Sequence, residues 1–524
     1  ALVSLLVSTL VFRISAYKIL VYNSKFGHSN VNFYGSIADI LVDAGHDVTS
    51  LIPEIDPSCT NGTLKSKVVL VPQTEGAKRI ISILHSEEVN WFTMDALDPW
   101  QILAPTPYAD QFVHQCRGVL EQKELLDRLR DEKFDVMIAE NFDMCGIGLV
   151  PLIRPRALIN GAASAPLPFM GPEFGLPLSL STNPSVTISH LDVHSFYSRL
   201  KNIYAELLGY KFFATSRSHV EQLFRDRFGP NYPSLMEISS RAAFTLINSE
   251  PLLDFATPTL NRVVYVGGLG AREPKKVDEK LDSILSLRNR TVLISFGSIV
   301  PAHELDINVK KAIVEAVSRF PDVTFIWKYE RPDDEFAKEA ASLAANLHLL
   351  RWISQNDLLA DRRLTAFVTH GGMGSTQELA LRGNPGLFIP IFGDQMRNAG
   401  MMERSGVGKV FDKLDLGNAE KLTAAIGDLL ENQQYRLNAE RIASMIAKKP
   451  FSARKQLIKT VEFAAEFGPS PVLRPMSYDM TWIEYCNLDI IVISLIFVSF
   501  LAYFFVQFAL IIVRKVVYIK IKEE

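Results

Sequence analysis

The sequence predicts an α/β protein with two domains built on parallel sheets, followed by one membrane-spanning helix. With 524 residues the chain is too long for one ordinary hydrophobic core, so two large domains are expected. Short apolar strand patterns alternate with helical patterns along most of the chain, which favours a parallel sheet in each half. Ile490–Val513 contains 24 residues without a charge. As a helix this stretch is about 36 Å long, enough to cross a hydrocarbon core of about 30 Å.

Composition limits the kinds of partner that we expect. The net charge of −3 gives no electrostatic argument for binding nucleic acid. The cysteines are too few for a disulfide framework, and no C-x-x-C pair suggests a metal site. We therefore expect no metal ion. We predict that the four cysteines are buried thiols rather than ligands: Cys59, Cys116, Cys145 and Cys486.

The chain begins with an apolar run of about twelve residues, too short to span a bilayer but suited to the core of a signal peptide. We predict a signal peptide over residues 1–16, cleaved near Ser15-Ala16, with a buried first strand as the alternative. In the secretory pathway, Asn61 and Asn289 would each begin an Asn-X-Thr glycosylation sequence.

The first domain is predicted over residues 17–266. Ala16–Tyr22 has a strand pattern, and a turn containing His28 follows it. Val31–Ala44 then carries apolar residues at helical spacing, and Gly45 ends the helix. Further strands are predicted at Lys67–Val71, Phe134–Glu140, Ala243–Asn248 and Val263–Val266.

Two segments of the first domain are predicted to be less regular. Residues 87–116 favour loops and short helices, and residues 161–185 are rich in Pro, Gly and Ser, a composition that is often functional in long loops. Aromatic residues follow at helical positions. They indicate either the apolar lining of a small-molecule pocket or simple core packing: Phe196, Tyr197, Tyr204, Tyr210, Phe212 and Phe213.

The second domain is predicted over residues 291–440, after a linker at 267–290. We expect a strand at Thr291–Phe296 that ends in Gly297-Ser298, a helix at Ala302–Arg319 and a strand at Val323–Lys328. The remaining segments are predicted as helices that approach the membrane at 441–488, a transmembrane helix at 489–513 and a basic tail at 514–524.

A glycine turn dominates the second domain. Ala366–Thr369 is a short strand, His370-Gly371-Gly372 turns the chain, and Ser375–Leu381 favours a helix before the strand Gly386–Pro390. Glycine permits close backbone approach to a ligand, and a helix N-terminus suits a phosphate group. The glycine spacing fits neither G-x-G-x-x-G nor a P-loop. An ordinary capping box from Ser375 to Glu378 is the alternative.

The residues around this turn resemble the signature of the UDP-glycosyltransferase family, and the resemblance extends over most of the chain, towards the animal, nematode-like, membrane-anchored branch. It implies a GT-B fold, in which two Rossmann-like domains face a cleft and C-terminal helices pack back on the first domain. It also implies an inverting transfer of sugar from a UDP-sugar to a small acceptor. The signature residues occur in order: Trp352, Gln355, His370, Ser375, Glu378, Asp394 and Gln395.

The resemblance implies roles for the donor-binding residues. Trp352 would stack on uracil, Gln355 would read its edge, and Glu378 would accept hydrogen bonds from the ribose. Asp394 and Gln395 would bind hydroxyls of the sugar. No cofactor is expected beyond the co-substrate, UDP-glucuronate or UDP-glucose, because contacts to the diphosphate can stabilise the leaving group. Those contacts would come from Ser298, His370, Gly372 and Ser375.

The catalytic base of the family is a histidine in the turn before the first helix, and this sequence departs from that pattern. The expected position falls at Asn30, or at Ser29 without a gap, and His28 lies just upstream. His28 is therefore either a shifted base or a surface histidine. The carboxylate that orients the base would be Glu140, with Asp143 as second choice, or a solvated strand end.

The expected activity is transfer of glucuronic acid, or glucose, to a small lipophilic hydroxyl acceptor, as in conjugation of xenobiotics. Arg514, Lys515, Lys520 and Lys522 follow the apolar helix, which places the tail in the cytosol and the catalytic domains in the lumen of the endoplasmic reticulum. The Lys520 and Lys522 pair is either a dilysine signal or a stop-transfer flank. Two alternatives remain: a catalytically weak UDP-sugar- or lipid-binding partner subunit, and a transferase that builds glycolipids. Homo- and hetero-oligomers both stay open.

Overall fold

The structure is a computed structural model that describes residues 16–84, 92, 94–102, 107–298 and 300–523. Apart from Ala16, the predicted signal peptide lies outside these residues. The chain divides into one compact unit that ends at Leu473 and a second unit that begins at Arg474. The first unit contains both parallel sheets, as the alternation of strands and helices predicts.

The first sheet has seven parallel strands in the order β3-β2-β1-β4-β5-β6-β7. Helices cover both faces, so β4 (V-M-I-A-E) is buried at every position. Two clusters of buried residues, one on each face, form the core of this domain. The strands are β1 (Lys18–Tyr22), β2 (Asp47–Pro53), β3 (Lys67–Val71), β4 (Val136–Glu140), β5 (Ala157–Ala162), β6 (Phe244–Ile247) and β7 (Val263–Tyr265).

The first helix begins at His28, three residues before the predicted start at Val31, because Gly27 with φ 69° turns the chain directly into it. The segment around residue 110 contains a 15-residue helix, α3, which is longer than the short helices that its composition predicts. The helices of this domain are α1 (His28–Asp43), α2 (Glu75–Leu84), η1 (Pro99–Ile102), α3 (Pro107–Glu121), α4 (Lys123–Asp131), α5 (Cys145–Ile153), η2 (Pro168–Met170), α6 (Gly171–Phe174), α7 (Phe196–Phe228) and α8 (Leu235–Ser240).

The second sheet has six parallel strands in the order β10-β9-β8-β11-β12-β13. The helix predicted at Ala302–Arg319 is split into a short 3-10 turn and α10, because the Asp306 side chain caps α10 by accepting a hydrogen bond from the Asn308 amide. The strands are β8 (Arg290–Ser295), β9 (Val323–Lys328), β10 (Leu347–Leu350), β11 (Leu364–Thr369), β12 (Gly386–Phe388) and β13 (Gly408–Val410).

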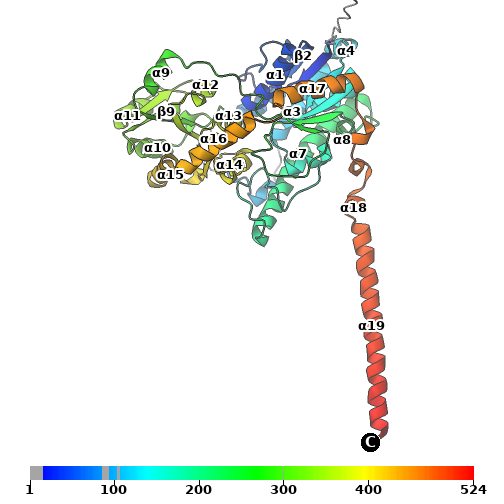
Figure 1. Ribbon diagram of the computed structural model, residues 1–524. Helices are drawn as coiled ribbons and strands as arrows, with labels where there is room; N and C mark the ends of the chain where they lie inside the picture. Colours follow the sequence, from blue (N-terminus) through cyan, green and yellow to red (C-terminus); the bar gives the residue numbers. More distant parts are fainter. Residues whose placement is uncertain (1–15, 85–91, 93, 103–106, 299, 524) are drawn as a thin grey trace, which may run out of the picture. The chain divides into compact units, whose positions relative to one another are not determined.

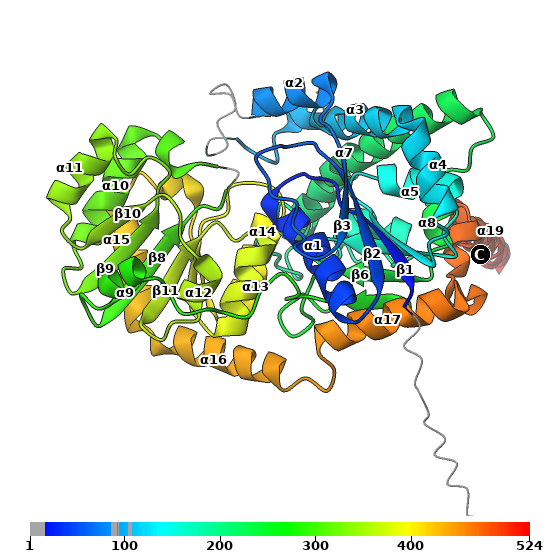
Figure 2. The ribbon, with the colours of Figure 1, turned by 90° about the horizontal axis from the view of Figure 1, so that it is seen from above.

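The last helices of the first unit return to the first domain. Leu457 and Val461 of α17 are fully buried in the same cluster as Ile19 of β1 and Ile37 of α1, and Figure 2 shows α16 leading from the second domain to α17 on the first. The helices from residue 279 onward are α9 (Glu279–Leu285), η3 (Ala302–Glu304), α10 (Ile307–Ser318), α11 (Glu335–Leu343), α12 (Gln355–Leu359), α13 (Met373–Arg382), α14 (Gln395–Arg404), η4 (Lys413–Asp415), α15 (Ala419–Glu431), α16 (Gln433–Ala447), α17 (Ala453–Phe467) and η5 (Pro471–Leu473).

The strand orders identify where ligands bind. Each sheet reverses its order once, between β1 and β4 in the first sheet and between β8 and β11 in the second. In open parallel sheets, ligands bind beyond the carboxyl ends of the strands at such a switch point. His28 and Glu140 lie at this point of the first sheet, and Gly297 and His370 lie at this point of the second.

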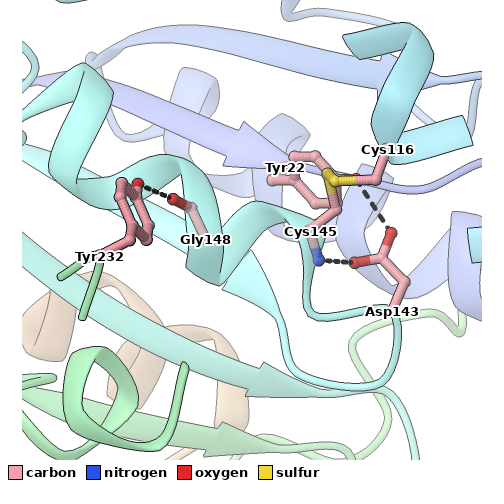
Figure 3. The surroundings of a disulfide bond; sticks show 6 residues. All are labelled: Tyr22, Cys116, Asp143, Cys145, Gly148 and Tyr232. Carbon is pink, nitrogen blue, oxygen red and sulfur yellow. Dashed lines mark hydrogen bonds between the residues drawn. A yellow bond between two sulfur atoms is a disulfide. The ribbon is translucent and has the colours of Figure 1, made fainter. Parts of the chain in front are cut away.

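One prediction about the cysteines is wrong. Cys116 of α3 and Cys145, the first residue of α5, form a disulfide with a Cα–Cα distance of 5.6 Å (Figure 3). The two residues are 29 apart in sequence, and only the packing of α3 against α5 brings them together. Cys59 is a buried thiol as predicted, and Cys486 is a half-exposed one.

The second unit consists of η6 (Met476–Asp479), α18 (Trp482–Tyr485) and α19 (Leu488–Glu523) (Figure 1). Within α19, Leu488–Ile519 has a mean hydropathy of 2.5 over its most apolar window. Its length and composition make it a candidate membrane span, in agreement with the predicted transmembrane helix.

Candidate active site

The turn after β11 holds the His370 ring between two glycines. A Cβ added to Gly297 would lie 2.7 Å from His370 Nε2, and a Cβ added to Gly372 would lie 2.5 Å from the same atom. Burial lowers the pKa of His370 to about 4; the hydrogen bond to the Ser295 backbone opposes this shift, and the charge of Lys328 adds to it. The imidazole is therefore neutral at physiological pH, and its single N–H can donate either to the Ser295 carbonyl or to an oxyanion.

The N-terminus of α13 lies directly after this turn. Gly372 is the N-cap residue, and no side chain caps the helix, so its first backbone N–H groups remain available to an anion. Ser375 lies inside the first turn of α13 and is not the N-cap, which excludes the capping-box alternative for Ser375 and Glu378. Ser298, at the end of the facing turn, is exposed. These groups can hold a diphosphate.

Gln355 connects two other predicted donor-binding side chains, Ser375 of the diphosphate set and Glu378 of the ribose contact. Gln355 Nε2 donates to Ser375 Oγ at 3.0 Å and to Glu378 Oε2 at 2.7 Å. Burial raises the pKa of Glu378, and the hydrogen bond from Gln355 counteracts part of that effect. Trp352 follows β10 with 74% of its side chain exposed, an unusual state for tryptophan that leaves its ring available for stacking on a base.

The predicted sugar-binding residues lie at the start of α14. Asp394 is its N-cap residue and accepts a hydrogen bond from Asn398 Nδ2 at 2.9 Å. The same amide donates to the Gly371 carbonyl at 3.1 Å, which ties α14 to the diphosphate turn. Gln395 Oε1 accepts from the Ile391 amide at 2.8 Å. This contact fixes the Gln395 side chain so that its Nε2 is the end that can donate to a sugar hydroxyl.

A buried arginine attaches α14 to the first domain. Arg397 is fully buried, and its Nη2 lies 2.7 Å from Asp254 Oδ1 and 3.0 Å from Asn183 Oδ1. Its guanidinium stacks over the Phe255 ring at 5.0 Å. Arg397 is three residues after Asp394 and two after Gln395, so the position of the predicted sugar-binding residues of α14 depends on residues of the other domain. The signature does not include this residue.

Lys328 is a second residue that the sequence-based predictions missed. It ends β9 (V-T-F-I-W-K), its side chain is 13% exposed, and Nζ donates to the Gly297 carbonyl. Its charge lowers the pKa of both His28 and His370. Lys328 therefore places positive charge close to both the first-domain and the second-domain parts of the site. A charged residue at the end of an otherwise apolar strand was the signal that could have identified it.

His28 is half-buried at the first position of α1. Burial lowers its pKa, the charge of Asp56 opposes the shift, and the charge of Lys328 adds to it. The ring is therefore mainly neutral at physiological pH, as a general base must be. Asn30 lies two residues later and donates from Nδ2 to the Ser24 carbonyl at 3.3 Å, so its amide is occupied by the turn that precedes α1.

Glu140 and Asp143 are both buried at the end of β4, and Figure 3 shows Asp143 beside Tyr22 and the disulfide. Glu140 Oε1 accepts from the Phe142 amide at 2.9 Å, and burial raises its pKa to about 8. Asp143 accepts from the Tyr22 hydroxyl and from the Cys145 amide, both at 3.0 Å, and burial raises its pKa to about 6. Glu140 is thus protonated at neutral pH, which does not suit a carboxylate that must stabilise an imidazolium.

The structure does not bring His28 and these two carboxylates together. Among the described residues, His28 forms no hydrogen bond or ion pair with Glu140 or Asp143. The carboxylate whose charge favours a protonated His28 is Asp56, in the segment after β2. Asp56 was not predicted, since it lies in a loop with no repeated pattern around it.

Aromatic side chains connect this end of the site to α7. Phe26 lies two residues before His28 and packs edge-on against Phe112, with 5.1 Å between the ring centroids. Phe112 in turn packs edge-on against Phe142, with 5.6 Å between the ring centroids. Phe142 in turn lies 6.1 Å from Phe212 of α7. Six aromatic residues were predicted either to line a pocket or to fill the core. Phe213 is buried in the core, and Phe212 is half-buried and lies against Phe142. In contrast, large parts of Phe196, Tyr197 and Tyr210 are exposed.

Comparison with known proteins places this geometry in a family. Residues 17–523 match the family described as UDP-glucoronosyl and UDP-glucosyl transferase. The putative UDP-glucuronosyltransferase ugt-47 of Caenorhabditis elegans is 29% identical over 505 residues, which cover 94% of this chain and 92% of that protein. UDP-glucuronosyltransferase 1A7 of Mus musculus is 25% identical over 492 residues, 89% of this chain and 87% of that protein.

Solved glycosyltransferase structures share the fold. The glycotransferase of kitacinnamycin superposes with a TM-score of 0.60 at 17% identity, covering 86% of this chain and 99% of that one. Phytolacca americana UGT2, complexed with UDP-2fluoro-glucose and pterostilbene, superposes with a TM-score of 0.58 at 14% identity, covering 86% of this chain and all of that one. The predicted GT-B fold is confirmed, and the chain belongs to the UDP-glucuronosyl and UDP-glucosyl transferase family of glycosyltransferases.

Proposed function

We propose that this glycosyltransferase moves glucuronic acid from UDP-glucuronate to a lipophilic hydroxyl acceptor, with His28 as the base. The observation that carries the proposal is the position of Lys328, whose charge acts on both His28 and His370. The charge of one cation thus acts on the neutral imidazole proposed for the acceptor and on the imidazole of the anion-binding groups proposed for the donor.

In the proposed reaction, the acceptor oxygen attacks the anomeric carbon as the bond from that carbon to UDP breaks, which inverts the anomeric centre. His28 takes the hydroxyl proton, and the carboxylate of Asp56 stabilises the imidazolium that forms. Negative charge grows on the departing diphosphate, where His370, the N-terminus of α13 and Lys328 can stabilise it. These contacts need no cofactor beyond the UDP-sugar itself.

The names of relatives and one cation of the site support glucuronate as the donor sugar. Several relatives are named UDP-glucuronosyltransferases, including those of C. elegans and mouse, and this favours glucuronate over glucose. Asp394 and the amide end of Gln395 suit the hydroxyls of either sugar. Lys328, which lies 3.6 Å from Glu330 Oε1, is a cation of the site that could also meet the C6 carboxylate, which glucose lacks.

We further propose that α19 crosses the membrane of the endoplasmic reticulum, with the catalytic domains in the lumen. Arg514 and Lys515 follow the apolar segment, and such residues remain on the cytosolic side. The disulfide between Cys116 and Cys145 supports this orientation, because disulfides persist in oxidising compartments such as the lumen. Asn289 is exposed and so is open to glycosylation there.

A catalytically weak binding protein is the second candidate. The observation that favours it is Asn30 at the position where the family base is expected, since an amide cannot take up a proton. The donor-binding groups would then hold a UDP-sugar without turnover. A glycolipid-building transferase differs from the main proposal only in the acceptor.

The test is UDP release from membranes that contain the full chain, with UDP-glucuronate or UDP-glucose and with phenolic or lipid acceptors. Acceptor-dependent release is expected, faster with UDP-glucuronate and a phenol. Release with UDP-glucose alone would reassign the sugar, and release with lipid acceptors alone would favour the glycolipid transferase. UDP binding without release from any pair would contradict the enzyme and support the binding protein.

A further inference from the structure

The first four turns of α7 carry an exposed apolar stripe. With 100° per residue, its members fall within about 80° around the helix axis, and their exposed fractions lie between 37% and 73%. The opposite side of the helix is buried and includes Ala205 and Phe213. We call this surface the α7 stripe: Phe196, Leu200, Ile203, Leu207 and Tyr210.

Two further aromatic residues extend the stripe. Tyr197 is 73% exposed beside it, and Trp100 of η1 is also 73% exposed. The Tyr204 hydroxyl donates to the Leu97 carbonyl at 3.3 Å, which holds the η1 segment against α7. Trp100 therefore lies on a segment that is held against the helix that carries the stripe. Contiguous exposed surfaces of this kind usually mark a binding partner.

Along α7 itself the charges beside the stripe have one sign, whereas the segment before η1 adds Asp95 and Asp98. Between Phe196 and Lys211 the basic residues are Arg199, Lys201 and Lys211, and the single acidic residue, Glu206, is buried. Exposed tryptophan, tyrosine and phenylalanine flanked by basic residues are typical of surfaces that lie at the headgroup level of a bilayer.

We propose that the α7 stripe and Trp100 form a membrane-docking surface, which inserts into the interface of the bilayer that α19 crosses. The proposal rests on the proposed anchor. Only 14 residues connect Leu473 to Leu488, where α19 begins, and such a segment spans at most about 50 Å. The first unit is therefore tethered at Leu473 within that length of the bilayer, and a bilayer is an apolar partner of the kind that the stripe requires.

Docking at this surface gives α7 a role in acceptor delivery. The inner side of the same helix carries Phe212, which connects through Phe142 and Phe112 to Phe26 beside the His28 turn. A lipophilic acceptor dissolved in the bilayer would meet α7 first, one helix diameter away from the aromatic residues that lead to the base.

The test places a fluorophore on single cysteines of the full chain in vesicles and measures quenching by doxyl-labelled phospholipids. The background is Cys486→Ser; Cys59 is buried, and burial raises the pKa of its thiol to about 12, so it stays unreactive. The labelled positions in the stripe are Leu200→Cys and Leu207→Cys. The controls are Leu343→Cys and Leu437→Cys, which are 61% and 56% exposed on α11 and α16. Ile496→Cys reports the anchor.

Loss of fluorescence at positions 200 and 207, with none at 343 and 437, is the expected result. Loss at 496 alone would overturn the docking surface while leaving the anchor in place. No loss at 496 would overturn both, because the tether would be missing. Self-quenching at 200 and 207 that grows with protein concentration and ignores doxyl lipids would assign the stripe to a second copy of the chain and overturn the proposal.

A second variant separates docking from catalysis. Leu200→Glu with Leu207→Glu should raise KM for a lipophilic acceptor in vesicles and leave KM unchanged in detergent micelles, where no bilayer surface exists. Leu343→Glu with Leu437→Glu is the matched control and should change neither value. An equal rise of KM in vesicles and micelles would indicate damage to the acceptor site and contradict the role of docking. The label experiment does not require turnover, so it remains decisive if the enzyme activity itself is absent.

Discussion

The part of the candidate site in the second domain, the donor half, and the part in the first domain, the acceptor half, differ in how closely they follow the family pattern. In the second domain, Gln355, Ser375 and Glu378 are in contact, and His370 is fixed between Gly297 and Gly372. In the first domain, an asparagine occupies the expected base position, and His28 contacts neither predicted carboxylate. The binding of UDP and the deprotonation of the acceptor are therefore separable properties, and variants can test each.

The largest effect is expected where the two halves are joined. Arg397→Met removes the buried partner of Asp254, and breaking a buried ion pair from one side costs about 3–5 kcal/mol of unfolding free energy. The donor sugar should also bind less well, since α14 would lose its attachment to the first domain. Denaturant unfolding measures the stability, and donor KM reports the sugar site.

Arg404→Met is the control for this variant. Arg404 stacks over the same Phe255 ring at 5.3 Å, but it is exposed, so its loss should change stability by less than about 1 kcal/mol. Equal effects of the two variants would show that the ring contact, and not the interdomain ion pair, holds α14 in place.

The next effect concerns the donor half alone. Gly372→Ala places a Cβ 2.5 Å from His370 Nε2 and displaces the imidazole, whereas Gly374→Ala, two residues later, meets no atom within 4 Å. Loss of one oxyanion-binding group typically lowers kcat about 10²-fold. Steady-state kinetics of the two variants should therefore differ by that factor. A similar kcat for both would mean that His370 does not contact the diphosphate.

A smaller effect is expected in the buried cluster of the first domain, and it appears as a pH dependence of stability. Burial raises the pKa of Glu140 from 4.5 to about 8. The stabilisation that results is complete below the unfolded pKa and is lost as the pH rises through about 8. The melting temperature should therefore fall between about pH 4.5 and about pH 8 and then level off.

Glu140→Gln keeps the shape of this side chain and removes its titration. Its melting temperature should depend less on pH over the same interval, with little change in UDP binding. A wild-type melting temperature that rises above neutral pH would contradict the protonated state of Glu140, and would restore this residue as a candidate partner for the base.

The predicted donor residues, apart from Ser298, lie within one stretch of 44 positions, Trp352–Gln395, where strand, turn and helix fix their spacing. Local patterns also predicted both sheets and the apolar helix α19, since apolar strands and a long uncharged run have distinct signatures. Boundaries were less accurate at α1 and α10, where a single cap residue decided the start.

The residues that could not be predicted act through tertiary contacts. Arg397 pairs with residues 143 and 214 positions away, and Cys116 meets Cys145 only because α3 packs against α5. Lys328 ends β9 of the second domain, and Asp56 lies in the loop after β2 of the first domain. The charges of both act on His28, and sequence spacing carries no information about this proximity. Exposure of Phe196 and Tyr197 likewise depends on which side of α7 faces the domain.

The most direct test of the account is the turnover of His28→Ala, measured as acceptor-dependent UDP release beside an independent measurement of UDP affinity. Loss of a general base should lower kcat by about 10²- to 10⁴-fold, with UDP affinity unchanged, because the donor groups lie in the other domain. Adding Asn30→His, which restores the family base, should recover part of the loss. Unchanged turnover in His28→Ala would contradict the assignment of His28 as the base.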